Sequence, residues 1–148
     1  MSQNEIKEQI AQYLGSHPFI NLATVTAQGA PQAHTVAFAA QGATVYFGTR
    51  QDTRKAANML ANPQVAYVVD QDQYAAFTEI TGVQMEGVAG QVTDAQEIAR
   101  ANALYAAKFG ESATITPSEQ HIVFKIGPVR AYFLDYSKGF GHKDLVEY

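Results

Sequence analysis

The chain contains no cysteine, which excludes disulfides, thiol catalysis and metal sites built from cysteine. No segment approaches the roughly 18 consecutive apolar residues that a membrane-spanning helix needs. Residues 1–15 form a charged, amphipathic segment that lacks the apolar core of a signal peptide. We therefore expect a soluble, cytoplasmic protein that has no membrane partner.

Charge is also scarce, since Asp, Glu, Lys and Arg together make up 16% of the residues and the formal net charge is −4. Apart from one cluster, the cations are spread along the sequence, so there is no basic footprint for nucleic acid. So little charge is compatible with a large buried interface between two copies of the chain. The histidines at positions 17, 34, 121 and 142 do not have metal-ligand spacing, so we predict no metal site.

What the sequence does contain is a series of short apolar, β-branched runs separated by glycine turns, which indicates a mainly β domain with about three helices. Its 148 residues suit a single domain, 1–148. The expected helices begin after caps at Asn4, at Asp52 or Thr53 and at Thr93 or Asp94, and they end at Gly15, Asn62 and Gly110. The expected strands are 19–26, 32–39, 43–49, 64–70, 79–93, 121–126 and 129–135.

These elements carry three further expectations. The first three strands are expected to form an antiparallel meander, because short turns that contain glycine join them. The second helix is expected to bury a stripe of Ala56, Met59 and Leu60, and the glycines of strand 79–93 indicate bulges or close approaches. Six or so antiparallel strands with flanking helices predict a small barrel.

One cluster of charge stands out, because Arg50, Arg54 and Lys55 lie within six residues at a strand-to-helix junction. The first turn of a helix already presents unpaired N–H groups and the positive end of the helix dipole, so cations are disfavoured there. A phosphate at this junction would meet the helix N-terminus, the cations and the hydroxyls of Thr49 and Thr53 together. The sequence therefore indicates an anion site at the junction.

A less specific interpretation of the cluster is that its cations are solvated, or that Asp52 neutralises one of them. The energies also limit what a phosphate alone can achieve. Two charge-assisted hydrogen bonds contribute about 1.5–3 kcal/mol each and the helix dipole up to about 1 kcal/mol, whereas micromolar binding needs about 8 kcal/mol. A ligand bound in the micromolar range is therefore expected to carry a sizeable apolar or aromatic group as well.

A series of short motifs follows the predicted elements in a fixed order. They are LATV (22–25), GAP (29–31), HTVAF (34–38), YFGT (46–49), TRK (53–55), NPQVA (62–66) and QMEGVAGQV (84–92). In this order they resemble the pyridoxamine 5′-phosphate oxidase-like family of FMN-binding split barrels, over nearly the whole chain. The resemblance implies a six-stranded antiparallel split β-barrel with about three helices, working as a homodimer with FMN at the interface.

The resemblance also assigns roles at the phosphate end of the cofactor. In that family an Arg-Lys pair and nearby hydroxyls hold the flavin phosphate. Carried over by position, these groups are Arg54, Lys55, Thr49 and Thr53, with Arg50 as an additional candidate.

At the ring end, the family lays the isoalloxazine along the second strand. Backbone groups around His34, Thr35 and Val36 are then expected to contact its polar edge, and Gln84 is a weaker candidate for a polar contact. For His34 the alternative is a residue at the edge of the core.

The tail differs from that of the enzyme that gives the family its name. That enzyme has a second phosphate site and a C-terminal Arg-x-His-x-Arg signature, whereas residues 138–144 here read KGFGHKD, without arginine. Vitamin B6 oxidation is therefore not expected, and the tail looks more like that of small bacterial members with Gly-Phe-Gly after the last strand. Phe140 is expected to cover the ring or to bury itself against a partner, and His142 is either solvated or a ligand to substrate or to the partner's flavin.

The sequence thus predicts an FMN-binding homodimer, most simply a small flavin-dependent oxidoreductase that acts on a small molecule or on NAD(P)H. No catalytic side chain is predicted, because the cofactor supplies the redox chemistry. Three alternatives remain open: a flavin-binding sensor or electron carrier without turnover, a relative that binds haem or a deazaflavin, and a structural or regulatory dimer with an empty site.

Overall fold

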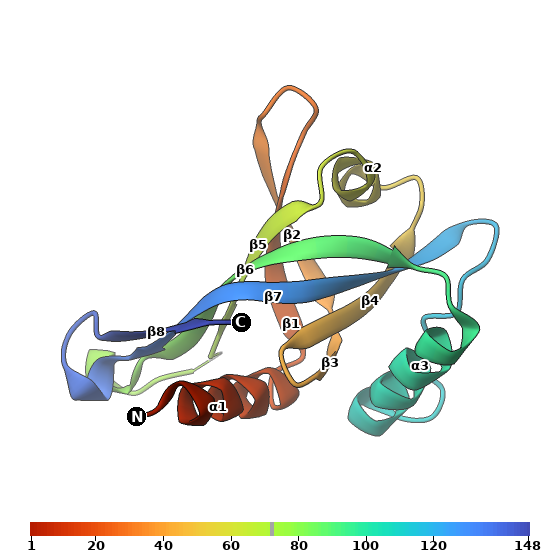
Figure 1. Ribbon diagram of the computed structural model, residues 1–148. Helices are drawn as coiled ribbons and strands as arrows, with labels where there is room; N and C mark the ends of the chain where they lie inside the picture. Colours follow the sequence, from red (N-terminus) through yellow and green to blue (C-terminus); the bar gives the residue numbers. More distant parts are fainter. Residues whose placement is uncertain (72) are drawn as a thin grey trace.

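The computed structural model describes residues 1–71 and 73–148. An antiparallel sheet curls on itself and three helices flank it, as Figure 1 shows. The strands are β1 Phe19–Val25, β2 Pro31–Ala37, β3 Ala39–Gln41, β4 Thr44–Arg50, β5 Gln64–Asp70, β6 Thr81–Val92, β7 His121–Asp135 and β8 Lys143–Glu147. The helices are α1 Gln3–Gly15, α2 Arg54–Ala61 and α3 Ala95–Phe109, with short 3-10 turns η1 Phe77–Glu79 and η2 Tyr136–Lys138.

The sheet closes because one segment belongs to both of its edges. The strand order is β2-β1-β5-β6-β7-β4-β3, and β2 and β3 are separated along the chain only by Phe38. Phe38 is fully buried, and its backbone N–H donates to the carbonyl of Pro18. Residues 31–41 therefore leave β1 and join β4, which turns the open sheet into a split barrel.

This closure corrects one expectation about the first three strands. β1 and β2 form the expected antiparallel pair, with Phe19 opposite Ala37 and Val25 opposite Pro31. The third expected strand, β4, pairs with the three residues of β3 and not with the body of β2. The meander is therefore wrong at its second connection, because the chain bends at Phe38 to change partners.

The barrel interior holds the main core. Alternation along β1 buries Ile20 and Leu22, while the helix α1 places Ile6, Ile10 and Leu14 against the same core at the spacing of one helical face. A second cluster lies under α3, where Tyr46, Ala101, Tyr105, Ile115 and Val123 pack together. The helix α3 lies outside the sheet near the start of β7 (Figure 1), whereas the apolar side chains of Val68 and Val88 are exposed on the outer face of β5 and β6.

The longest strand also differs from its expectation. We predict two strands on either side of Gly127-Pro128, whereas β7 is continuous through them. A bulge makes this continuity compatible with proline, since Glu86 pairs with Arg130 but its neighbour Gly87 pairs with Pro128. The expectation that a glycine of this long strand marks a bulge or a close approach is confirmed at Gly87, where an added Cβ would lie 2.5 Å from Ile126 Cγ2.

Two further differences concern the ends of elements. β8 is not predicted, and it forms because Gly139 and Gly141, both at positive φ, reverse the tail so that it pairs with residues 130–134 of β7. The expected burial of Ala56 and Met59 in α2 is confirmed, but Leu60 is 58% exposed and Asn58 is buried in its place. None of the described helices combines the length and the apolar character needed to cross a membrane.

Candidate functional site

The strand-to-helix junction between β4 and α2 forms a tightly bonded turn. Thr53 caps α2, since its hydroxyl accepts the N–H of Ala56 at 3.3 Å and donates to the carbonyl of Arg50 at 2.8 Å. The hydroxyl of Thr49, which is buried, lies 3.3 Å from that of Thr53. The two predicted hydroxyls therefore lie together and fix where α2 begins.

The three cations of the junction have different environments. Arg50 forms a two-point ion pair with Asp52, with both hydrogen bonds at 3.0 Å, and these bonds hold the pKa of the Asp52 carboxyl below its ordinary value. Neutralisation of one cation by Asp52 is thus confirmed. Arg54 and Lys55 form no ion pair within the part of the chain that the structure describes. We call Thr49, Arg50, Thr53, Arg54 and Lys55 the cation corner.

A chain of side-chain hydrogen bonds ties α2 to the β1–β2 hairpin. Asn58 of α2 donates from Nδ2 to Thr24 Oγ1 and to Gln32 Oε1, each at 2.9 Å. Thr24 Oγ1 in turn lies 2.8 Å from His34 Nε2. Sequence reasoning does not single out Thr24, Gln32 or Asn58. The one feature of the sequence that indicates this network is the amide of Asn58, which lies in the middle of the otherwise apolar inward face of α2.

The imidazole of His34 lies within the electrostatic field of the cation corner. Burial is the largest cause that lowers its pKa below the ordinary value, followed by the charges of Lys55 and Arg54. The structure therefore brings His34 to the same end of the barrel as the two unpaired cations. A proton on His34 would place a third positive charge there.

The predicted backbone contacts belong to one exposed side of a strand. β2 pairs with β1 only, so the other side of residues 31–37, the β2 edge, has backbone groups that the sheet does not use among the described residues. Val36 turns its side chain into the core, so only its backbone is available at this edge. Thr35 is exposed on the outer face of the sheet, where its hydroxyl lies 3.4 Å from Asn21 Oδ1.

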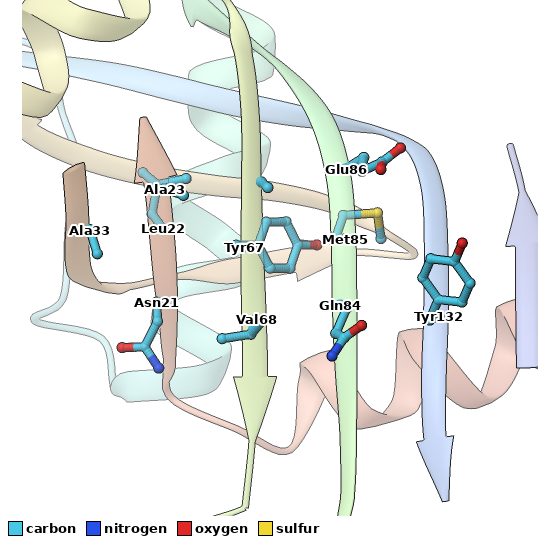
Figure 2. A pocket seen from close by; sticks show the side chains of 11 residues that line it. Asn21, Leu22, Ala23, Ala33, Tyr67, Val68, Gln84, Met85, Glu86 and Tyr132 are labelled. Atoms are coloured by element: carbon cyan, nitrogen blue, oxygen red, sulfur yellow. The ribbon is translucent and has the colours of Figure 1, made fainter. Parts of the chain in front are cut away.

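A groove of about 380 Å³ crosses the outer face from β2 to β7. Figure 2 shows its lining residues in cross-strand rows. One row consists of small side chains, with Ala33, Ala23 and Ala66 as successive partners on neighbouring strands. The next row is amphipathic, and it runs through Thr35, Asn21, Val68, Gln84 and Tyr132. Gln84 and Thr35 thus lie on one row of one face, on strands that are not neighbours.

The two predicted tail residues lie away from the cation corner. Phe140 is 88% exposed and contacts the ring of Tyr136 at a centroid distance of 5.2 Å. His142 Nε2 lies 3.2 Å from Asp144 Oδ1. β4 leads into the corner from the start of β7 whereas η2 follows its end (Figure 1), and a 15-residue strand spans up to about 45 Å. The structure therefore does not bring Phe140 and His142 to the corner of their own chain.

Within the described residues, no three His, Asp or Glu side chains gather closely enough to hold a metal ion. The groups that do gather are the cations Arg54 and Lys55, the N–H groups at the start of α2, and the backbone N–H and C=O groups of the β2 edge. A donor set of this kind fits a phosphorylated organic ligand, because the anion and the polar edge of an attached ring are both recognised by donors.

The sheet curls on itself, the chain switches between its edges at Phe38, and α2 is tied to the β1–β2 hairpin. Together these features define a protein of the split-barrel class. A sequence model described as pyridoxamine 5′-phosphate oxidase matches residues 6–135. The chain therefore belongs to the pyridoxamine 5′-phosphate oxidase family. Among curated protein sequences, none matches the chain significantly.

Solved structures with the same fold carry different names. The haem-binding protein from Mycobacterium smegmatis superposes with a TM-score of 0.79 at 19% identity, over 99% of this chain and 58% of that protein. HutZ, the haem storage protein from Vibrio cholerae, gives 0.70 at 22% identity, over 82% of this chain and 88% of HutZ. General Stress Protein 26 from Bacillus anthracis gives 0.71 at 17% identity, over 97% and 99%. At such identities the likeness establishes the fold alone, and this chain spans little more than half of the M. smegmatis protein.

Proposed function

We propose that this protein binds FMN at the cation corner and β2 edge of a homodimer and acts as a small flavin-dependent oxidoreductase. The observation that carries the proposal is the pair of cations, Arg54 and Lys55, in the first turn of α2 without a counter-ion among the described residues. A phosphate dianion would turn this repulsion between cations and helix dipole into attraction. Family membership supports the same ligand, since the family's name-giving substrate and its flavin are both phosphate esters.

Each part of the site has a distinct task in this proposal. Arg54 and Lys55 bind the phosphate, while Thr49 and Thr53 hold the start of α2 in place and offer hydroxyls to it. Arg50 is engaged by Asp52 and contributes only if that exposed ion pair opens. The backbone of His34, Thr35 and Val36 along the β2 edge meets the polar side of the ring, and the row that contains Gln84 extends this contact over the outer face.

The bound flavin would supply the hydride-accepting centre, so the protein's task is to bind, to orient and to exclude water. This division assigns no acid–base role to a side chain of the corner. The open face of the flavin ring would then react with NAD(P)H or with another small reductant.

A homodimer is part of the proposal for a geometric reason. Phe140 and His142 lie at the opposite end of β7 from the cation corner of their own chain, so a second copy is needed for tail residues to reach a flavin. The uncovered groove, with its row of alanines, is the face on which we expect the second copy to pack. Phe140 would then cover the partner's ring, and His142 would lie near it.

Haem is the second candidate ligand, because two structural neighbours are named as a haem-binding and a haem storage protein. The cation corner would then bind a haem propionate in place of a phosphate. The absorbance spectrum of the purified protein separates the two, since oxidised flavin absorbs in the blue with a shoulder and haem gives a sharp Soret band. A protein that is colourless and gains no thermal stability with FMN or haem would contradict both candidates.

The phosphate contacts are tested by comparing FMN with riboflavin in the double variant Arg54→Ala, Lys55→Ala. Loss of two charge-assisted hydrogen bonds should weaken FMN binding by at least about 100-fold and leave riboflavin binding nearly unchanged. The matched control, Lys7→Ala with Arg100→Ala, removes the same charge away from the corner and should keep the preference for FMN. Equal losses for both ligands in the corner variant would mean that the phosphate binds elsewhere.

A further inference from the structure

The hydrogen bonds of the buried Thr24 hydroxyl can have only one arrangement of donors and acceptors. It is almost completely buried, and among the described residues its oxygen forms hydrogen bonds only with Asn58 Nδ2 and His34 Nε2. A hydroxyl carries a single hydrogen, and Asn58 already donates to its oxygen. The Thr24 hydrogen must therefore go to His34 Nε2, because a buried donor without an acceptor would be costly.

This hydrogen-bond direction determines the form of the imidazole. A nitrogen that accepts a hydrogen bond carries no proton, so His34 is neutral and its single N–H is on Nδ1. Nδ1 has no partner among the described residues. His34 therefore offers one uncommitted N–H donor next to the β2 edge.

The surroundings of His34 favour the same form. The charged groups that act on the ring come from α2 and are both positive, Lys55 and Arg54, while β1 contributes the neutral Thr24 and α2 the neutral Asn58. No carboxylate in the described chain is among the groups that shift its pKa. Burial and these two cations lower the pKa of His34, which keeps the ring uncharged at neutral pH.

We propose that Asn58, acting through Thr24, is a positioning residue that holds His34 as a neutral imidazole whose Nδ1–H donates to the ligand at the cation corner. The hydrogen-bond chain would thus do two things at once. It anchors α2, which carries the phosphate-binding cations, to the hairpin that presents the β2 edge, and it selects one tautomer of the histidine between them. The ligand's role rests on the proposed function, whereas the tautomer is a property of the free protein.

The tautomer is measured by NMR of the imidazole nitrogens and Cδ2 of His34 in the ligand-free protein, with a pH titration. The wild type should show the Nδ1–H tautomer and a pKa below the ordinary value of histidine. Asn58→Leu removes the donor to Thr24, so the preference for one tautomer should be lost. Asn102→Leu, which removes a structural asparagine of α3 that accepts from the Ile115 N–H, is the matched control and should change neither quantity.

A second variant keeps the test decisive if Asn58→Leu does not fold. Asn58→Asp has the same shape but accepts where the amide donated, so the Thr24 hydrogen should turn to the carboxylate and His34 should switch to the Nε2–H tautomer with a raised pKa. A wild-type Nε2–H tautomer, or a tautomer that N58D leaves unchanged, would overturn the proposal.

The ligand's part is measured separately, by titrating FMN into the same variants. Asn58→Leu should weaken FMN binding about three- to tenfold, as expected for one hydrogen bond, while N102L should not. If the tautomer responds as expected but FMN affinity does not, the positioning of His34 stands and its donation to the ligand is refuted. If FMN does not bind the wild type at all, the proposed function fails while the tautomer result is still obtained.

Discussion

At the scale of single residues, the structure depends on a few positions where no side chain fits. Gly87 is one of them, because a Cβ there would lie 2.5 Å from Ile126 Cγ2 and 2.9 Å from the carbonyl oxygen of Gly127. The bulge that lets β7 continue through Pro128 is built on this close approach. Gly90, three residues further along the same strand, has nothing within 4 Å of its would-be Cβ.

We predict that Gly87→Ala lowers the free energy of unfolding by about 1–3 kcal/mol, the usual cost of forcing atoms into a packed site. Gly90→Ala is the matched control and should be neutral or slightly stabilising, since alanine costs less chain entropy than glycine in a strand. Urea denaturation of both variants measures the difference. Equal stabilities would show that β6 and β7 separate easily at the bulge.

The residues of the site divide sharply into those that sequence predicts and those that it does not. Thr53, Arg54 and Lys55 could be predicted because capping and the helix dipole are local effects, readable within one turn. Thr24 and Asn58 could not, since their hydrogen bond joins residues 34 positions apart and depends on how α2 lies over the hairpin. The predicted burial of Leu60 is wrong for a related reason. Because α2 has only eight residues, its hydrophobic pattern defines the buried face only coarsely.

At the scale of elements, α2 is attached to different parts of the barrel at its N-terminus and at its middle. Its N-terminus is held by Thr53, next to Thr49 of β4, and its middle by Asn58, which bonds to the β1–β2 hairpin. A short helix has little stability of its own. The geometry of the cation corner therefore depends on these few side-chain bonds.

We predict that Thr53→Ala destabilises the protein by about 1 kcal/mol and also weakens FMN binding severalfold, because the cap fixes the first turn that carries both cations. Ser2→Ala removes the corresponding cap of α1, where the Ser2 hydroxyl accepts the Glu5 N–H at 3.2 Å. This control should lose similar stability and keep its FMN affinity. Thermal unfolding and FMN fluorescence titration give the two readouts, and an unchanged affinity in T53A would contradict the prediction.

In this protein the bounds and pairing of the strands are harder to predict from the sequence than the positions of the capped helices. The sequence does not predict β8, because this strand has little hydrophobic alternation. It is defined by its pairing with residues 130–134 and by the turns at two glycines. The joining of two expected strands into β7 was missed because proline normally ends a strand, and only the bulge opposite it makes the continuation acceptable. The number of helices and the antiparallel class are correct, since caps and hydrophobic alternation define them locally, although α1 is capped by Ser2 and not by the expected Asn4.

At the scale of the whole molecule, the outer face of the sheet carries the groove that the proposed homodimer would cover. Val68 lies in the middle of the amphipathic row and is 39% exposed, and its neighbours on that row include Asn21 and Gln84. In the proposed homodimer this apolar side chain is covered by the second copy. The main core of the chain does not include the residues of this row, so a change there leaves the core packing in place.

We predict that Val68→Lys gives a folded monomer, because a charge on this row would have to be buried in the interface. Leu60→Lys places the same charge on a more exposed apolar position of α2 and should leave the dimer intact. Light scattering after size exclusion gives the mass, and circular dichroism checks the fold. A V68K protein with the mass of two chains would show that the groove is not the interface.

The pairing of β4 has a consequence for how the protein is made. One side of β4 meets β3 at once, but the other side pairs with residues 121–126, so it has no partner while residues 51–120 are being synthesised. At about 5–20 residues per second, the ribosome leaves this edge unpaired for several seconds or longer. Open N–H and C=O groups on a nascent apolar strand invite pairing with another chain. Chaperone protection during translation would therefore matter most for the segment around residues 44–50.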